Sequence, residues 1–158
     1  MSTVQPLYGS SGQSYSVTLN SLGSAAYKSG APLHNTSLFD DYRFQFKWKN
    51  GASVSGVPTV SVYLAESADG GTTYSDGLAA SSTVTPTATP NLKLLYQLNC
   101  PTASTQYTSD VFWVKSAAGI WTLPDYCFLV FLNGTGGTSD STAGNFSVWY
   151  EGVNPQIV

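Results

Sequence analysis

Strict alternation of aromatic and polar side chains over residues 42–49 limits the possible folds of this chain more than any other feature. In YRFQFKWK, the four rings at 42, 44, 46 and 48 fall on one side of an extended strand, and the arginine, glutamine and lysines fall on the other. An α-helix would spread the four rings around its circumference. The segment is therefore predicted to be a half-buried strand that ends at Asn50-Gly51.

Other strand-like segments recur along the chain, separated by stretches rich in Gly, Pro, Ser, Thr and Asn. They cover residues 14–19, 59–66, 92–99, 111–115, 126–132 and 146–152. This spacing predicts an all-β fold, an antiparallel β-sandwich of about seven or eight strands with a jelly-roll-like arrangement.

Three segments carry more specific expectations. The continuous apolar run YCFLVFL (126–132) predicts a strand buried on both faces. SLGSAAYKS (21–29) is the one weak helix candidate, and NGTGGTSDSTAGN (133–145) is predicted to be a long flexible loop.

The length of 158 residues and the 42% of hydrophobic residues suit one domain with a substantial core. Residues 13–158 are predicted to form this single β-sandwich domain. The turn-rich stretch MSTVQPLYGSSG (1–12) is predicted to be a flexible N-terminal arm, which either lies on a neighbouring molecule or frays.

Charged residues make up only 9% of the chain, against about 25% in an average soluble protein. Six basic and nine acidic residues give a net charge of −3, so the basic stripe that nucleic-acid binding requires is missing. No apolar run approaches a membrane span, and no secretory leader is visible, so we expect synthesis in a cytoplasm and no membrane partner. A surface rich in Ser and Thr suits a protein that is covered by neighbours in an assembly.

The stretch SADGGTTY (67–74) fits a motif that is repeated in sialidase-type propellers. Such a propeller needs about one copy per blade and arginines for its substrate, whereas this chain has one copy and one arginine. The motif is therefore interpreted as a turn in which Asp69 accepts backbone hydrogen bonds and Gly70 and Gly71 supply positive φ angles. Tyr74 is expected to fold back as an apolar lid.

No catalytic, cofactor-binding or metal-binding residues are predicted, and we expect that the protein is not an enzyme. His34 is the only histidine and lies in a connecting segment, without a GxSxG nucleophile motif elsewhere. Cys100 and Cys127 form no metal-binding pattern and are expected to be reduced, buried thiols. A pair of carboxylates serving a small glycan hydrolase is the least favoured alternative.

Possible partner contacts are sought among exposed apolar residues. Three of the four tryptophans lie in strand patterns, where core packing is the expected role, but Trp121 in AGIWTLPDY lies near a turn. Trp121 and two residues of the arm, Leu7 and Tyr8, are therefore the candidate contact residues.

The order and spacing of four segments resemble those of small virion structural proteins of tailed bacteriophages. These segments are SLGSAAYKSGAPLHNTSLFDDYRFQFKWKNGASVSG, VSVYLAESADGGTTYSDG, NLKLLYQLNCPTASTQYTSDVFWVKSAAGIWTLPDYCFLVFLNGTGG and SVWYEGVNPQIV. The resemblance implies a capsid decoration or cement protein, a homotrimer on the capsid surface of the virion that bridges major capsid protein subunits. It brings no catalytic residues. The alternative within the virion is a tail or head-fibre β-sandwich protein that binds host surface glycans through Trp121.

Overall fold

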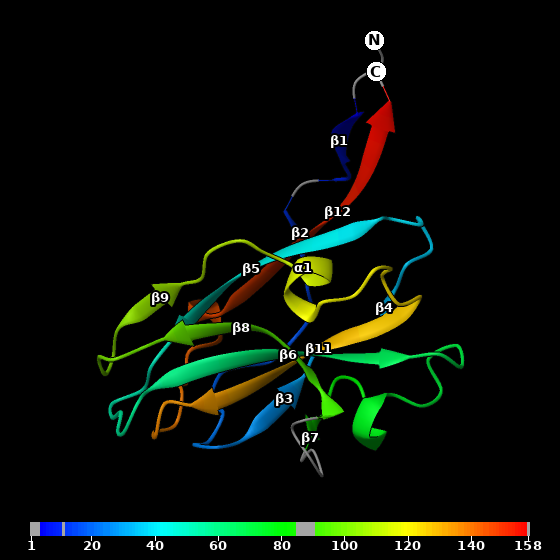
Figure 1. Cartoon of the computed structure of the whole chain (residues 1–158). Coiled ribbons are helices and arrows are strands. Elements are labelled where there is room, and N and C mark those ends of the chain that lie inside the picture. The colour runs from blue at the N-terminus through cyan, green and yellow to red at the C-terminus, as the bar shows by residue number, and fades with distance from the viewer. Residues whose placement is uncertain (1–3, 11, 85–90, 158) are drawn as a thin grey trace.

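Two antiparallel six-stranded sheets packed face to face make up the protein (Figure 1). The computed structural model describes residues 4–10, 12–84 and 91–157. The prediction of an all-β sandwich is confirmed.

Sheet A has the strand order β1-β12-β5-β10, with β2 also beside β12 and β9 also beside β5. Its strands are β1 (Val4–Tyr8), β2 (Gln13–Ser14), β5 (Asp41–Lys49), β9 (Gln106–Thr108), β10 (Phe112–Trp113) and β12 (Ser147–Ile157).

Sheet B has the order β7-β3-β11-β6-β8, with β4 also beside β11. Its strands are β3 (Tyr27–Ser29), β4 (Leu33–His34), β6 (Thr59–Ser67), β7 (Thr83–Val84), β8 (Lys93–Asn99) and β11 (Tyr126–Gly134). In each sheet a late strand lies between two early ones, β12 next to β5 and β11 next to β6. The jelly-roll-like arrangement stays a prediction.

The predicted number of seven or eight strands was wrong, because the described residues form twelve. Six of these strands (β2, β3, β4, β7, β9 and β10) are only two or three residues long. Period-two alternation needs about four residues before it becomes visible in a sequence. Short strands such as β9 and β10 both border β5, so they share one position in the sheet.

Two local predictions were also wrong. The weak helix candidate at 21–29 contains turns and then β3, which pairs with β11. The segment 111–115 holds the two-residue strand β10, after which helix α1 (Val114–Ala118) begins. Helix α1 ends at Gly119, which adopts the left-handed conformation that commonly closes helices. The described residues also contain the 3-10 turns η1 (Ser75–Gly77) and η3 (Ala143–Asn145).

The core lies between the two sheets and is dominated by the rings of β5. Tyr42, Phe44, Phe46 and Trp48 are all buried, whereas the alternate residues of β5 are half-exposed on the outer face of sheet A. The predicted division of this strand into an aromatic and a polar face is confirmed.

Strand β11 is buried on both faces, as the sequence predicted. Leu129 and Phe131 pack into the core between the sheets. Phe128 and Val130 point to the outer face of sheet B, where they join a second apolar cluster with Tyr74. The chain between β6 and β8 thus covers the outer face of its own sheet, and Tyr74 lies over Phe128 with 4.5 Å between ring centroids.

The loop at 133–145 is held by buried polar groups, contrary to the expectation of a long flexible loop. The side-chain nitrogen of Asn133 donates hydrogen bonds to the carbonyl oxygens of Leu22 (2.7 Å) and Gly137 (2.8 Å). The hydroxyl of Ser139, also buried, donates to the carbonyl oxygen of Leu19 at 2.7 Å. Two buried polar side chains therefore hold a loop whose composition suggests flexibility.

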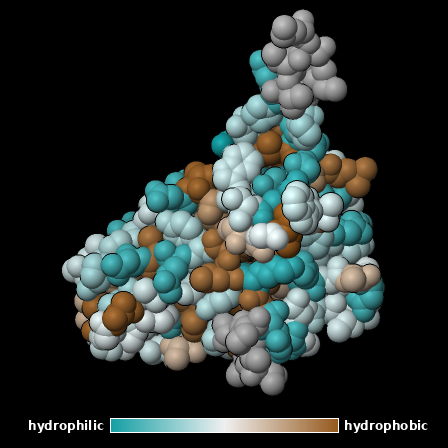
Figure 2. Space-filling view, in the orientation of Figure 1, coloured by the Kyte–Doolittle hydropathy of each residue, from teal (hydrophilic) through white to brown (hydrophobic). Residues whose placement is uncertain are grey.

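Both ends of the chain leave the sandwich together. Strand β12 pairs with β5 only as far as Val153, opposite Asp41, and continues beside β1 alone. Residues 4–8 and 153–157, here called the terminal ribbon, form a two-stranded projection from the body (Figures 1 and 2). Residues 4–8 belong to the segment predicted as an arm, and the structure places them in this paired strand. The flexibility of the arm stays a prediction, and residues 1–3 and 11 lie outside the described part of the chain.

Candidate interaction surface

A cleft of about 690 Å³ opens at the base of the terminal ribbon. The ribbon supplies one wall, and the segments 35–40 and 122–123 supply the other. The residues that line the cleft are Leu7, Asn35, Ser37, Leu38, Phe39, Asp40, Thr122, Leu123, Asn154 and Pro155. Figure 2 shows the ribbon standing clear of the body, with hydrophobic residues at the surface around its base.

The cleft follows from the pairing of β12. Side chains alternate between the two faces of a strand, and Tyr8, opposite Val153, lies on the outer face with Arg43. Leu7 therefore lies on the inner face, which elsewhere in the sandwich packs against sheet B. Leu7 is half-exposed because it lies beyond the end of that packing, and Leu38 across the cleft is 80% exposed.

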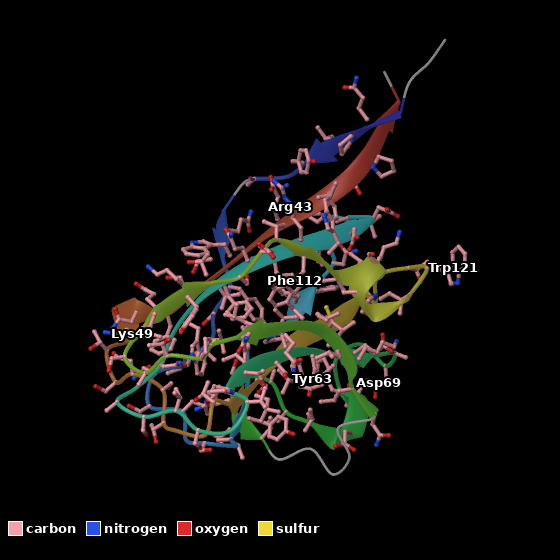
Figure 3. The ribbon with its side chains drawn as sticks, turned by 60° about the vertical axis from the view of Figure 1, so that its left-hand side comes forward. Arg43, Lys49, Tyr63, Asp69, Phe112 and Trp121 are labelled. Carbon is pink, nitrogen blue, oxygen red and sulfur yellow. The ribbon has the colours of Figure 1, made fainter. Side chains whose placement is uncertain are left out.

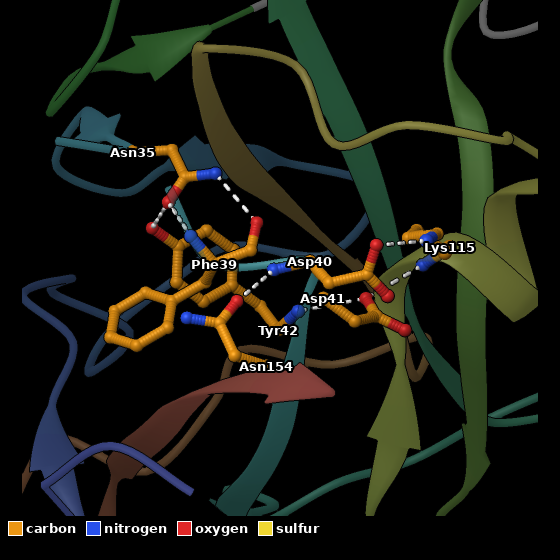
Figure 4. Close-up of polar contacts among 7 residues, drawn as sticks. All are labelled: Asn35, Phe39, Asp40, Asp41, Tyr42, Lys115 and Asn154. Atoms are coloured by element: carbon orange, nitrogen blue, oxygen red, sulfur yellow. Dashed lines mark hydrogen bonds and ion pairs between the residues drawn. The ribbon is translucent and has the colours of Figure 1, made fainter. Parts of the chain in front are cut away.

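The facing loop is held in place by Asn35 (Figure 4). The side-chain oxygen of Asn35 accepts hydrogen bonds from the backbone N–H of Phe39 (2.8 Å) and the hydroxyl of Tyr42 (3.2 Å). Its side-chain nitrogen donates to the carbonyl oxygen of Phe39 at 2.9 Å. One buried side chain thus closes the turn 35–39 and fixes it to the core.

The acidic residues of this loop are also paired. Asp40 Oδ1 accepts a hydrogen bond from Lys115 Nζ at 2.8 Å, and the backbone N–H of Asp40 donates to Asn154 Oδ1 at 2.8 Å. Asp41 accepts from the backbone N–H of Lys115 and of Tyr42. Burial raises the pKa of Asp41 above its usual value, although these two N–H groups oppose the shift. The cleft is therefore bordered by charges that are already matched.

The three predicted contact residues lie at the same end of the molecule but not on one patch. Leu7 lines the cleft, whereas Tyr8 lies on the opposite face of the ribbon, where its ring covers the guanidinium of Arg43 at 4.3 Å. Trp121 is 94% exposed and points away from the loop that follows α1 (Figure 3). Its neighbour Thr122 lines the cleft.

Sequence reasoning missed Leu38, Asn154 and Pro155. Leu38 has φ of 51°, a backbone conformation that no local pattern marked, because leucine rarely adopts it. The prolines in VQPLY and VNPQI were a usable signal, since both segments look like strands that carry a proline.

The outer face of sheet A carries a polar and aromatic group near the ribbon. Glu151, which is buried, accepts hydrogen bonds from Nε (2.8 Å) and Nη2 of Arg43. The guanidinium also lies 6.0 Å from the ring of Trp113. Arg43 is therefore held between Tyr8 and this face, and its charge is matched by a carboxylate.

The SADGGTTY motif forms the predicted turn. Asp69 Oδ1 accepts hydrogen bonds from the backbone N–H of Thr73 (2.8 Å) and Thr72 (3.1 Å) and from the hydroxyl of Ser67 (2.7 Å). These bonds lower the pKa of Asp69 to about 2, the N–H of Thr73 contributing most. Gly70 and Gly71 have φ of 75° and 82°, as the turn requires. Every oxygen contact of Asp69 thus serves the turn.

Two carboxylates line a common hollow of about 380 Å³ beside this turn, Glu66 and Asp125. Each has a basic partner. Glu66 accepts a hydrogen bond from Lys93 Nζ, and Asp125 lies 3.4 Å from His34 Nε2, while His34 stacks on Tyr126. A glycosidase instead keeps one of its two carboxylic acids protonated in apolar surroundings. The pairing here fits a solvent-exposed ion-pair arrangement better than that chemistry.

The two thiols are poorly placed to act as nucleophiles. Cys100 and Cys127 are buried and free, and burial raises the pKa of each to about 12. Within residues 4–10, 12–84 and 91–157, no three His, Cys, Asp or Glu side chains are grouped to hold a metal ion. In the same ranges, no helix has the length and apolar character to cross a membrane.

Comparisons with protein-family models, with curated proteins and with solved structures find no match to this chain.

Proposed function

We propose that the chain is a virion structural protein of a tailed bacteriophage, a capsid decoration or cement protein that binds the capsid surface and bridges major capsid protein subunits. In this role it is made in the host cytoplasm, forms a homotrimer and catalyses no reaction. The observation that carries the proposal is the terminal ribbon with its cleft, a projecting contact surface on a rigid sandwich.

Three features of the surface support the proposal. The ribbon and cleft expose Leu7 and Leu38, which a free-standing protein has reason to bury. The one acidic residue that lines the cleft, Asp40, is already paired with Lys115. The third feature is that the ribbon continues the long strand β12, which pairs with β5 in the body, so a contact on the ribbon is connected directly to sheet A.

The proposed mechanism is mass action. A protein that binds the assembled shell, and not its free subunits, stabilises that shell by the free energy of its own binding. No chemical step is required.

Binding to purified, expanded capsids tests the proposal. The wild-type chain is expected to cosediment with capsids at micromolar concentration and to raise the temperature at which the shell dissociates. A Leu7→Asp variant is expected to bind more weakly, whereas Val57→Asp, which changes an exposed residue of the β5–β6 connection, serves as the control. Failure of the wild-type chain to bind such capsids would refute the proposal.

A second candidate function is binding of host surface glycans by a tail or head-fibre protein. The observation that favours it is Trp121, whose indole is 94% exposed and is available to stack on a sugar ring. A glycan array distinguishes the two functions. Binding of a defined glycan that is lost in Trp121→Ala would support this candidate, and an array without signal would count against it.

A further inference from the structure

Each edge of the terminal ribbon carries a proline that disfavours pairing with a further strand. The backbone N–H of Gly9 donates to the carbonyl oxygen of Gly152 at 2.8 Å. Hydrogen-bonded and non-hydrogen-bonded pairs alternate along an antiparallel ladder, so the pair Pro6 and Pro155, three residues further along the register, is not hydrogen-bonded. The backbone groups of both prolines therefore point outwards, one to each free edge of the ribbon.

Proline has no N–H, so each edge lacks one of the donors that an added strand would use. Such prolines are a common means of preventing edge-to-edge pairing. A partner of the ribbon must accordingly make its main contacts with side chains on the two faces, rather than extend sheet A by another strand.

The faces of the ribbon need such contacts. A two-stranded ribbon without further packing is marginal in water. Gln5, Pro6, Leu7, Tyr8 and Pro155 are exposed, and none of them is charged. The cleft beneath the ribbon has the same character, because Leu38, Phe39 and Leu123 form its apolar part and Asp40 is neutralised by Lys115.

We propose that the terminal ribbon of one copy of this chain packs, by its face, into the cleft of a second copy. An uncharged ribbon and a cleft without unmatched charge are electrostatically compatible, whereas a charged partner would have to be desolvated there without compensation. The ribbon is itself one wall of the cleft, so two copies that exchange ribbons cover both the cleft and the ribbon of each molecule. Contacts of this kind repeat around a symmetry axis and produce closed dimers or rings. The surface involved is the one proposed to bind the capsid, so self-association of free copies and capsid binding are expected to compete for it.

Mixed cross-linking tests which surfaces meet. Chains carrying Leu7→Cys are mixed with chains carrying Leu38→Cys under mild oxidation, where the native cysteines are silent because they are buried. We expect a cross-linked dimer that contains one chain of each kind and that forms much faster than in a mixture of Leu7→Cys with Val57→Cys chains. Equal rates in the two mixtures would overturn the proposal.

Solution mass measured by light scattering over a concentration series gives the second test. The wild-type chain is expected to associate, and Leu7→Asp and Leu38→Asp are each expected to raise the dissociation constant at least about tenfold. Both side chains are exposed within one copy, so the circular dichroism spectrum should stay unchanged, and the unfolding temperature should differ from the wild type only at concentrations where the wild type associates. Val57→Asp should associate like the wild type.

The role of the prolines has its own variant. Pro6→Val restores a donor to one edge, and we expect additional, open-ended association that the wild-type chain does not show. Unchanged behaviour would contradict the inference that this edge is blocked. A wild-type chain that stays monomeric at all concentrations would refute self-association through the ribbon and the proposed homotrimer in solution. Capsid binding itself would still be supported if the monomer binds capsids.

Discussion

At the scale of single residues, buried amides organise parts of this protein that look unstructured in the sequence. Asn50 accepts a hydrogen bond from Trp48 Nε1 at 2.8 Å and donates to the carbonyl oxygens of Cys100 (2.8 Å) and Thr102 (2.9 Å). Asn133, at the start of the 133–145 loop, likewise donates hydrogen bonds to backbone carbonyl oxygens. A buried amide in such a position is satisfied by backbone groups that no strand uses.

Replacement of Asn133 by alanine is expected to lower the free energy of unfolding by about 3 kcal/mol, because it removes a buried amide that donates to the carbonyl oxygens of Leu22, Gly23 and Gly137. Urea denaturation measures the change. Asn91→Ala, which removes one exposed hydrogen bond to Asp76, is the matched control and should cost less than about 0.5 kcal/mol. Equal effects of the two substitutions would contradict the role assigned to Asn133.

Two aspartates that accept backbone hydrogen bonds, the exposed Asp69 and the partly buried Asp140, make the stability depend on pH. Backbone N–H groups, those of Thr73 and Thr142 first, lower the pKa of Asp69 and of Asp140 from 3.8 to about 2. Their contribution to stability is therefore present above about pH 4 and is lost as the pH falls towards 2. The double variant Asp69→Asn, Asp140→Asn should show a shallower fall of unfolding temperature between pH 4 and pH 2 than the wild type. Asp125→Asn, an exposed carboxylate outside both turns, should leave the slope of the wild type in place.

At the scale of elements, β12 connects the core, the cleft and the ribbon. Gly152 makes this possible, because a Cβ atom at this position would lie 2.2 Å from Cδ2 of Phe39. The ring of Phe39 packs over the backbone of β12 and forms part of the cleft. The close contact between this strand and the loop at 35–40 therefore requires a glycine at position 152.

Gly152→Ala is consequently expected to displace Phe39, to destabilise the fold by about 1–3 kcal/mol, and to weaken association through the cleft. Calorimetry and light scattering measure the two effects. Gly144→Ala is the control, because its added Cβ meets no atom within 4 Å. An unchanged unfolding temperature of Gly152→Ala would show that Phe39 can move without cost.

The elements that the sequence predicted well are the long ones. Alternation identified β5, and the continuous apolar run identified β11 as a strand buried on both faces. Both predictions work because every second residue of a strand lies on the same face. Strands of two residues such as β4 and β10 depend on neighbours far away in the chain and leave no periodic trace. Leu7 and Trp121 could be selected as exposed apolar residues. The cleft, however, is formed by β1, β12 and two loops that are far apart in the chain, and no local sequence pattern predicts that they lie together.

At the scale of the whole molecule, low charge determines how the protein recognises partners. Only 9% of the residues are charged, and the cleft contains no unmatched carboxylate among its described lining residues. Association through this surface therefore depends on apolar contact and shape more than on Coulomb attraction.

Self-association is accordingly expected to change less than about threefold between about 0.1 M and about 1 M salt, although the Debye length falls from about 10 Å to about 3 Å over this range. Sedimentation equilibrium at several salt concentrations measures the dependence. A dissociation constant that rises steeply with salt would indicate that charged residues outside the cleft carry the contact.

The side-by-side exit of both chain ends has a practical consequence for protein engineering. Because Val4 is opposite Ile157, a short linker could join the two ends, and new termini could be opened in the exposed connection between β5 and β6. Such a circular permutant would keep every strand of the sandwich while it closes the tip of the ribbon. It would also keep affinity tags away from that tip, because a tag at either end of this chain would occupy the place where a second molecule is expected to bind.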